Sequence, residues 1–161
     1  MDVRRAAFAG SWYPDSAAEC EADIKRYIQN ASPPELSCMG GIVPHAGWYF
    51  SGEIACRVIH RLKSGPPPDV VVLFGMHLHP ESPCYIMAEG AWETPFGNLS
   101  IETDVARHLL AAFSFQVETA QRHTQDNTIE LQLPFIKYFF QDTKIVPLGL
   151  PPVESSLKLG V

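Results

Sequence analysis

The sequence lacks any apolar run approaching the roughly 18 residues that a membrane helix needs. Its start, with Asp2, Arg4 and Arg5, also lacks the apolar stretch of a signal peptide. Basic residues are scarce, because 12 Lys and Arg stand against 18 Asp and Glu and the formal net charge is −6. Such a chain has no positive field with which to gather phosphates. We therefore expect a cytoplasmic protein that binds neither a membrane nor nucleic acid.

The sequence also has no C-x-x-C pair, the spacing common in zinc sites and redox motifs. Its four cysteines are scattered along the chain as Cys20, Cys38, Cys56 and Cys84. A chain of 161 residues, 46% of them hydrophobic, can form a core without disulfides, so we interpret the cysteines as reduced thiols. The same length and composition predict one folded domain over residues 1–161.

Apolar residues recur at helical spacing in some segments and form short continuous runs in others. Helices are predicted over residues 17–29 and 51–63, and two more are predicted to begin at Thr103 or Asp104 and at Thr128, the last bent at Pro134. Strands are predicted over residues 39–43, 69–74, 84–88 and 143–148, with a hairpin or loop over 92–101 and an extended piece over 115–118. This alternation predicts a layered α/β domain with a mainly parallel sheet flanked by helices.

Two histidines follow predicted strands at the point where each strand ends. His45 comes after the run 39–43, and His77 comes after the run 69–74. The helix between these runs makes a βαβ unit, whose strands run parallel and end at the same edge of the sheet. Ligands of open parallel sheets bind in the crevice at that edge. Two neutral imidazoles brought together there suit a divalent transition metal, commonly zinc or iron(II).

Two further residues are candidates for acid–base catalysis. His123 lies in a polar loop and could reach the rim of the pocket, although an ordinary solvated loop residue is the alternative. Glu130, on the first turn of the helix that begins at Thr128, could cap that helix, support a histidine or face solvent. His79 could replace His77 or line the pocket, whereas the remaining histidines, His60 and His108, fall within predicted helices and receive no role.

Aromatic residues are concentrated in predicted loops, as Trp12, Tyr13, Trp48, Tyr49, Phe50 and Trp92. They could form an apolar wall for an aromatic or peptide ligand. They could equally close the ends of the sheet as an extension of the core, and the sequence does not choose between the two.

Five segments together resemble the Memo family in order and approximate spacing, over essentially the whole chain. They are A-G-S-W-Y-P at 9–14, P-H-A-G-W at 44–48 with Ser51-Gly52, F-G at 74–75 before His77, E-T-P-F-G at 93–97 and I-E-L-Q-L-P-F at 129–135. Bacterial and archaeal relatives are named AmmeMemoRadiSam system protein B. The resemblance implies a fold similar to class III extradiol dioxygenases, enzymes that hold non-haem iron(II) with two histidines and a carboxylate.

By the matching segments, His45 corresponds to the family's first metal-site histidine, and His77 to the second if one residue is deleted after Gly75. The family's E-H-S-I-E segment reads D-N-T-I-E at residues 126–130, so Asn127 stands in place of a histidine and cannot act as a base near neutral pH. Family members are longer, and the resemblance implies that their C-terminal half brings the remaining ligands. We expect this chain to be the N-terminal half of such a domain, with the C-terminal part missing.

Two functions fit these observations. One is a dioxygenase-like metalloenzyme that holds iron(II) or another divalent transition metal with His45 and His77 and oxidises a small aromatic molecule. The alternative is a non-catalytic regulatory protein whose cleft binds a peptide or partner protein. A metal-dependent hydrolase is the weakest of the three readings because no H-E-x-x-H signature occurs. A homo-oligomer in which another chain completes the metal site would be compatible with either main function.

Overall fold

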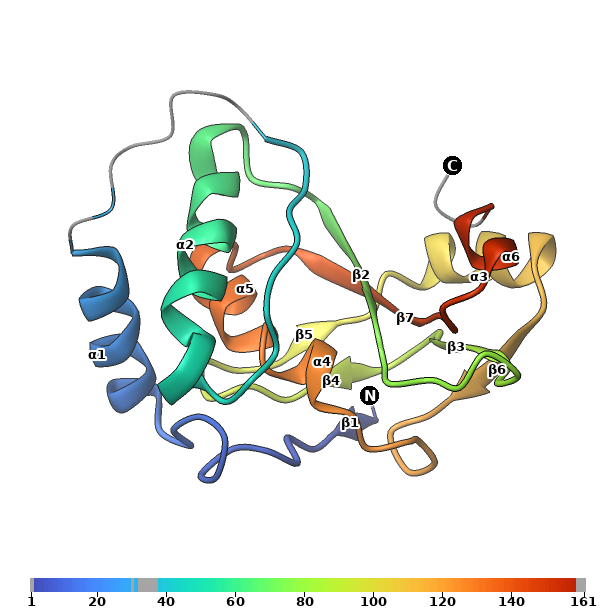
Figure 1. The fold of residues 1–161 in the computed structure, drawn as a ribbon, viewed down its shortest axis with the longest axis horizontal. Coiled ribbons are helices and arrows are strands. Elements are labelled where there is room, and N and C mark those ends of the chain that lie inside the picture. Colours follow the sequence, from blue (N-terminus) through green and yellow to red (C-terminus); the bar gives the residue numbers. More distant parts are fainter. Residues whose placement is uncertain (1, 30, 32–37, 159–161) are drawn as a thin grey trace.

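Two β-sheets form the centre of the molecule in the computed structural model, which describes residues 2–29, 31 and 38–158 (Figure 1). The larger sheet contains, in spatial order, β2 (Val70–Gly75), β7 (Lys144–Gly149), β3 (Cys84–Met87) and β6 (Phe115–Glu118). The smaller sheet contains β1 (Val3–Arg4), β4 (Ala91–Trp92) and β5 (Leu99–Ser100).

The larger sheet joins two parallel pairs of strands. β2 runs parallel to β7, with Val70 opposite Lys144 and Gly75 opposite Gly149, and β3 runs parallel to β6. The two pairs meet where β3 lies antiparallel to β7. In the smaller sheet β4 and β5 pair antiparallel, as expected for a hairpin over 92–101. The predicted layered α/β class, with a mainly parallel sheet, is confirmed.

Helices cover the larger sheet on both faces. Three helices pack against one another on one side: α1 (Ala17–Ile28), α2 (Glu53–Arg61) and α5 (Leu133–Phe139). Short turns η1 (Trp48–Gly52) and η2 (Leu62–Ser64) flank α2, and α4 (Asn127–Glu130) leads into α5. Figure 1 shows α3 (Thr103–Ala112) and α6 (Glu154–Leu157) near β3 and β6, away from α1 and α2. Within the described residues, no helix is both long and apolar enough to cross a membrane.

Alternating side chains of β7 explain why both faces are covered. Ile145 packs in the core cluster that contains residues of α2 and α5, whereas Val146 and Leu148 pack with Ala106 of α3. Successive residues of a strand point to opposite faces, so an apolar run such as β7 requires a cover on each side. The position of the helices therefore follows from the strand's composition.

The predicted strand over 39–43 does not form, and this prediction was wrong. Residues 39–43 lie in an extended segment that pairs with no strand among the described residues. Met39 and Ile42 are fully exposed, and a Cβ on Gly41 would lie only 2.5 Å from Val58 of α2. Gly41 of the segment packs on α2, and Val43 packs against the core cluster, whereas the larger apolar side chains remain exposed. The hydrophobic run therefore does not correspond to a buried strand. The paired βαβ unit is consequently absent from the described structure.

The helix predicted from Thr128 is divided in two. α4 ends at Glu130, and α5 begins at Leu133 with Pro134 in its first turn. Proline is favoured there because the first backbone N–H groups of a helix have no intrahelical acceptor. Pro134 therefore marks the start of a new helix and not, as predicted from the sequence, a bend inside a longer one.

Two thiols are sealed inside the helical layer. Cys20 of α1 and Cys56 of α2 are both fully buried, and burial raises the pKa of each thiol to about 12. Because the thiolate is the reacting species, we expect iodoacetamide at pH 8 to label neither residue in the folded protein. Peptide mass spectrometry should find both labelled only after denaturation. Labelling of either residue at the rate of the unfolded chain, without denaturant, would contradict the packing of α1 on α2.

Candidate functional site

The structure brings the rings of His45 and His77 together. The two Nε2 atoms lie 3.1 Å apart, and the ring centroids are separated by 4.9 Å. His77 follows β2 by two residues, and His45 lies in the loop that precedes η1. When two imidazoles bind one ion at metal–nitrogen distances of about 2.0–2.1 Å, their two coordinating nitrogen atoms lie roughly 2.9–3.4 Å from each other. The observed separation falls in that range, and it also permits a hydrogen bond in which one Nε2–H donates to the other ring.

Asp126 fixes the orientation of His77. One carboxylate oxygen of Asp126 accepts hydrogen bonds from the backbone N–H and the Nδ1 of His77, both at 2.8 Å. The other oxygen accepts from the backbone N–H of Thr128 at 2.8 Å and from its hydroxyl. With Nδ1 holding its proton against the carboxylate, the lone pair of a neutral His77 ring is on Nε2, facing His45.

The environment of Asp126 keeps it ionised. Its side chain is 9% exposed, and this burial alone would raise its pKa. Hydrogen bonds from Thr128 and His77 outweigh the burial and hold the pKa of Asp126 below its ordinary value. In the sequence, Asp126 stands out only as the first residue of the D-N-T-I-E segment, and no role was predicted for it. Its position before the first helical turn, where an Asp side chain commonly caps a helix, was the available signal.

The segment around α4 also holds His45. The Nδ2 group of Asn127 donates to the backbone carbonyl of His45 at 2.6 Å, and Nε2 of Gln132 donates to that of Pro44 at 3.1 Å. Asn127 therefore acts as a positioning group at the place where the resemblance led us to expect a histidine. Adjacent residues 126 and 127 thus orient the two histidines, one through its ring and the other through its backbone.

Trp48 anchors the end of the His45 loop in the core. Its indole is 3% exposed and stacks on Phe135 with a centroid distance of 4.0 Å and an interplanar angle of 9°. Its Nε1–H donates to the carbonyl of Leu131 at 3.0 Å. This packing connects the P-H-A-G-W segment to α5, so the loop that carries His45 is held at both of its ends.

An open groove of about 560 Å³ lies over the two histidines. Trp12, Tyr49 and Phe50 contribute aromatic side chains to it, and Tyr49 and Phe50 are 91% and 79% exposed. The other aromatic candidates, Tyr13, Trp48 and Trp92, are buried in the core. Three of the loop aromatics therefore belong to the core, as one of the two alternatives expected, and the other three line an open groove.

Comparison with known proteins identifies the family. A family model described as Memo-like protein matches residues 4–158. The chain belongs to the Memo-like family. It is 32% identical to a MEMO1 family protein of Pyrobaculum aerophilum, 33% to one of Methanosarcina mazei and 35% to one of Pyrococcus furiosus. Each alignment covers at least 98% of this chain but only 61%, 59% and 57% of the respective relative. The chain spans about three fifths of the length of these curated relatives.

The two candidate acid–base residues of this Memo-like chain lie outside the lining of the groove. Glu130 is 1% exposed and accepts hydrogen bonds from the backbone N–H of Phe8 at 2.7 Å and from the hydroxyl of Tyr13 at 3.2 Å. It ties the A-G-S-W-Y-P loop to α4. His123 is partly buried, with its Nδ1 3.2 Å from the carbonyl of Thr119. Their catalytic roles stay predictions, and the geometry gives them structural contacts instead.

Met76 occupies an unusual backbone conformation beside the site. Among the residues that the structure describes, it is the one non-glycine residue with a positive φ, at 78°. Its backbone N–H donates to the hydroxyl of Thr128 at 2.6 Å. Such a conformation costs free energy in an ordinary residue and persists where surrounding contacts impose it. Here it turns the chain at the end of β2 so that His77 meets Asp126.

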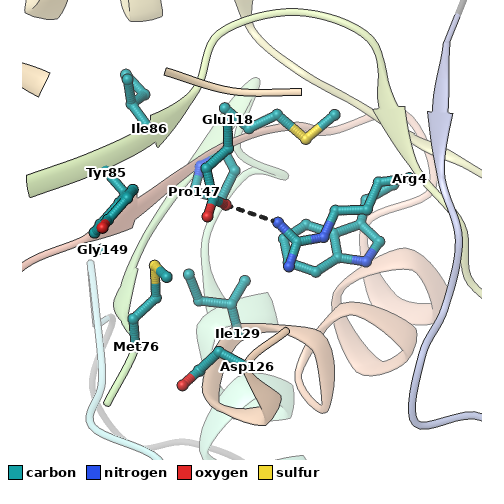
Figure 2. Close-up of a pocket in the computed structure, with 11 residues that line it drawn as sticks. Arg4, Met76, Tyr85, Ile86, Glu118, Asp126, Ile129, Pro147 and Gly149 are labelled. Carbon is teal, nitrogen blue, oxygen red and sulfur yellow. Dashed lines mark hydrogen bonds and ion pairs between the residues drawn. The ribbon is translucent and has the colours of Figure 1, made fainter. Parts of the chain in front are cut away.

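Beneath the site lies a small internal cavity of about 10 Å³, room for one water molecule (Figure 2). Arg4 reaches across it to Glu118, with a 2.9 Å ion pair, and its guanidinium lies 3.6 Å from the ring centroid of Trp92. Asp126 and Met76 belong to the same lining. The cavity therefore lies between Arg4 and Trp92 of the smaller sheet and the two residues, Met76 and Asp126, that precede and orient His77.

Proposed function

We propose that this Memo-like protein binds a divalent transition metal through His45 and His77, with iron(II) as the first candidate. The observation that carries the proposal is the 3.1 Å separation of the two Nε2 atoms, with His77 oriented by a buried carboxylate. A carboxylate behind a histidine is a common support of metal-ligating imidazoles, because it fixes the tautomer and raises the basicity of the ring.

The residues present fit part of a coordination sphere. Two imidazoles provide two ligands, and among the described residues no group of three His, Cys, Asp or Glu side chains is placed to hold an ion. The remaining positions would be filled by water, by a bound molecule or by residues outside the described part of the chain. A sphere with open positions is typical of a catalytic metal rather than a structural one.

We further propose that the groove binds a small aromatic molecule beside the metal, and that the complete protein oxidises it. Trp12, Tyr49 and Phe50 would stack on and shield the ring, and the two histidines would hold the ion at the groove's floor. Dioxygen would be the oxidant, and a bound iron(II) ion would supply the redox chemistry between dioxygen and the ring. The resemblance to AmmeMemoRadiSam system protein B and to class III extradiol dioxygenases supports this choice of substrate and reaction.

Anaerobic calorimetric titration with iron(II) tests the proposal. We expect one ion per chain for the wild-type protein, and loss of that binding for His45→Ala. His108→Ala is the matched control, because His108 lies exposed on α3, away from the groove, and should bind as wild type does. Absence of binding to wild type, or equal binding by His45→Ala, would contradict the metal site. Catechol titrated into the iron-loaded protein then tests the groove, and oxygen uptake tests the reaction.

Asp126→Asn should weaken metal binding by about 10- to 100-fold without unfolding the protein. The amide oxygen can still accept hydrogen bonds from Thr128. The NH2 group that replaces the other oxygen cannot accept the two hydrogen bonds from His77, and the negative charge behind the ring is lost. Asp104→Asn on α3 provides the control. The Asp104 side chain is 80% exposed and pairs only with Arg107 among the ion pairs of the described residues, so this change should leave the metal affinity unchanged. An Asp126→Asn protein with wild-type affinity would mean that the carboxylate does not orient a ligand.

The exposure of Tyr49 and Phe50 favours a second function, the binding of a partner peptide in the same groove. Single exposed aromatics are ordinary, but two adjacent ones in edge-to-face contact at a groove resemble a binding surface. Should His45→Ala abolish metal uptake and leave partner capture intact, while Phe50→Ser abolishes capture, the groove would act as a docking site independently of the metal.

A further inference from the structure

β2 is an edge strand with one open side. In the larger sheet of the described residues, its neighbour is β7 on one side, and no strand lies on the other. The carbonyl of Asp69 accepts from Lys144, and that of Gly75 accepts from Leu150, both in the direction of β7. In a parallel ladder alternate residues bond to the same neighbour, so the odd-numbered residues of β2 face β7. The backbone groups of Val70, Val72 and Phe74 consequently face the open side.

The same strand also has an open face. Val71 and Leu73 pack on the core cluster below α2 and α5, whereas Val72 and Phe74 point the other way and are 44% and 56% exposed. Natural proteins usually shorten, charge or cover such an edge, because unpaired backbone groups beside apolar side chains template the addition of another strand. β2 has six residues, and none of them is charged. Nothing in its sequence protects the edge.

The open edge forms one wall of an apolar groove of about 680 Å³. Residues 38–41 and Val43 contribute to the opposite side, and α2 contributes Val58 and Ile59. Figure 1 shows this segment running from the top of α2 down beside β2. Met39, which lines the groove from this segment, is exposed. The groove thus offers a strand edge, an apolar floor and additional apolar side chains at its rim.

We propose that this groove receives an extended strand that hydrogen-bonds to the open edge of β2, and that the strand belongs to the part of a Memo-like protein that this chain does not match. The chain covers 61%, 59% and 57% of three relatives, so about two fifths of a family-length protein has no counterpart in it. Among the described residues, β2 offers that part of the family sequence a strand edge without a neighbouring strand and an apolar face.

A second copy of this chain fits the groove less well. In each copy the β2 edge lies within a groove that residues 38–41 and Val43 also line, so two β2 edges cannot approach each other without displacing both of these segments. An extended strand from elsewhere meets no such obstacle. The surface is also distinct from the proposed metal site, because Val72 and Phe74 do not line the groove over the histidines.

Hydrogen exchange of the chain alone provides the first test. We expect the backbone amides of Val72 and Phe74 to exchange on the order of 10-fold faster than those of Val71 and Leu73, which face β7. Equal protection of the two sets would overturn the proposal, since the edge would then already be covered.

Co-expression provides the second test. The partner is the part of the Pyrococcus furiosus relative that lies outside its match to this chain, and co-expression lets the two polypeptides fold together. We expect them to co-purify, with the amides of Val72 and Phe74 slowed on the order of 10-fold in the complex. Failure to co-purify, or a complex in which these amides exchange as before, would overturn the proposal.

A matched pair of variants locates the contact. Val72→Lys places a charge on the open edge and should reduce recovery of the complex on the order of 10-fold. Val117→Lys on β6, the opposite edge strand, is the control, because Val117 is 47% exposed and Val72 is 44% exposed. Thermal melting of each variant alone checks that it folds. Equal recovery with the two variants would overturn the proposal, as would a homodimer of this chain that Val72→Lys disrupts.

Discussion

His77→Ala is expected to raise the dissociation constant for a divalent transition metal by at least about 100-fold, because it removes one of the two ligands rather than the support of one. The His45 ring alone would hold an ion no better than a surface histidine does. Calorimetric titration of wild-type and variant protein measures the change. The fold should persist, since the His77 side chain is 59% exposed and contributes little to the core.

His79→Ala is the closest control for this prediction. His79 lies two residues further along the same loop, is 72% exposed and has its Nδ1 near the backbone N–H of Glu81 at 3.2 Å. Its replacement should leave the metal affinity at the wild-type value. If His79→Ala weakened binding and His77→Ala did not, the ligand would be His79, the alternative that the irregular spacing after Gly75 left open. Equal weakening by both variants would contradict the assignment of His77 alone.

Arg4→Ala is expected to lower the free energy of unfolding by about 3–5 kcal/mol, the usual range for removal of one partner of a buried ion pair. Arg4 is 3% exposed, and its loss would leave Glu118 buried without its charged partner (Figure 2). It would also remove the hydrogen bond to the carbonyl of Thr124 at 2.9 Å and the stacking on Trp92. Urea denaturation followed by circular dichroism measures the loss.

Arg5→Ala tests whether burial causes the effect of Arg4→Ala. The ion pair of Arg5 with Glu93 is shorter, at 2.6 Å, but the Arg5 side chain is 81% exposed. Exposed pairs contribute about 0–1 kcal/mol, so this variant should be almost as stable as wild type. Similar losses for Arg4→Ala and Arg5→Ala would contradict the claim that the internal position of Arg4 makes its ion pair important.

Much of the fold was predictable from local patterns. The helix beginning after Ser16, the strand from Val70 and the last strand all combine a clear period with a clear boundary residue, and local signals of this kind survive folding. The segment 39–43 has a similar apolar content but a glycine that packs on α2, so that tertiary contact decided its conformation. A contact with a helix later in the chain cannot be predicted from the five residues of this segment alone.

The candidate site was predictable in part for the same reason. Strand-end positions pointed to His45 and His77, although the strand assumed before His45 does not form. Convergence of the rings instead depends on Asp126 and Asn127, which are distant in sequence from both histidines. Glu130 shows the converse, because a carboxylate near a motif looked chemical and is in fact fully occupied by Phe8 and Tyr13. Whether a residue lines the site or supports the core depends on hydrogen-bond partners that are far apart in sequence. Motif spacing does not reveal those partners.

X-ray absorption spectroscopy of the protein loaded with one equivalent of zinc(II) tests the central claim most directly. The geometry of His45 and His77 predicts two imidazole nitrogens at about 2.0–2.1 Å from the metal, completed by oxygen ligands, and one imidazole fewer in His77→Ala. A first shell with sulfur at about 2.3 Å, or one without imidazole scattering, would contradict it.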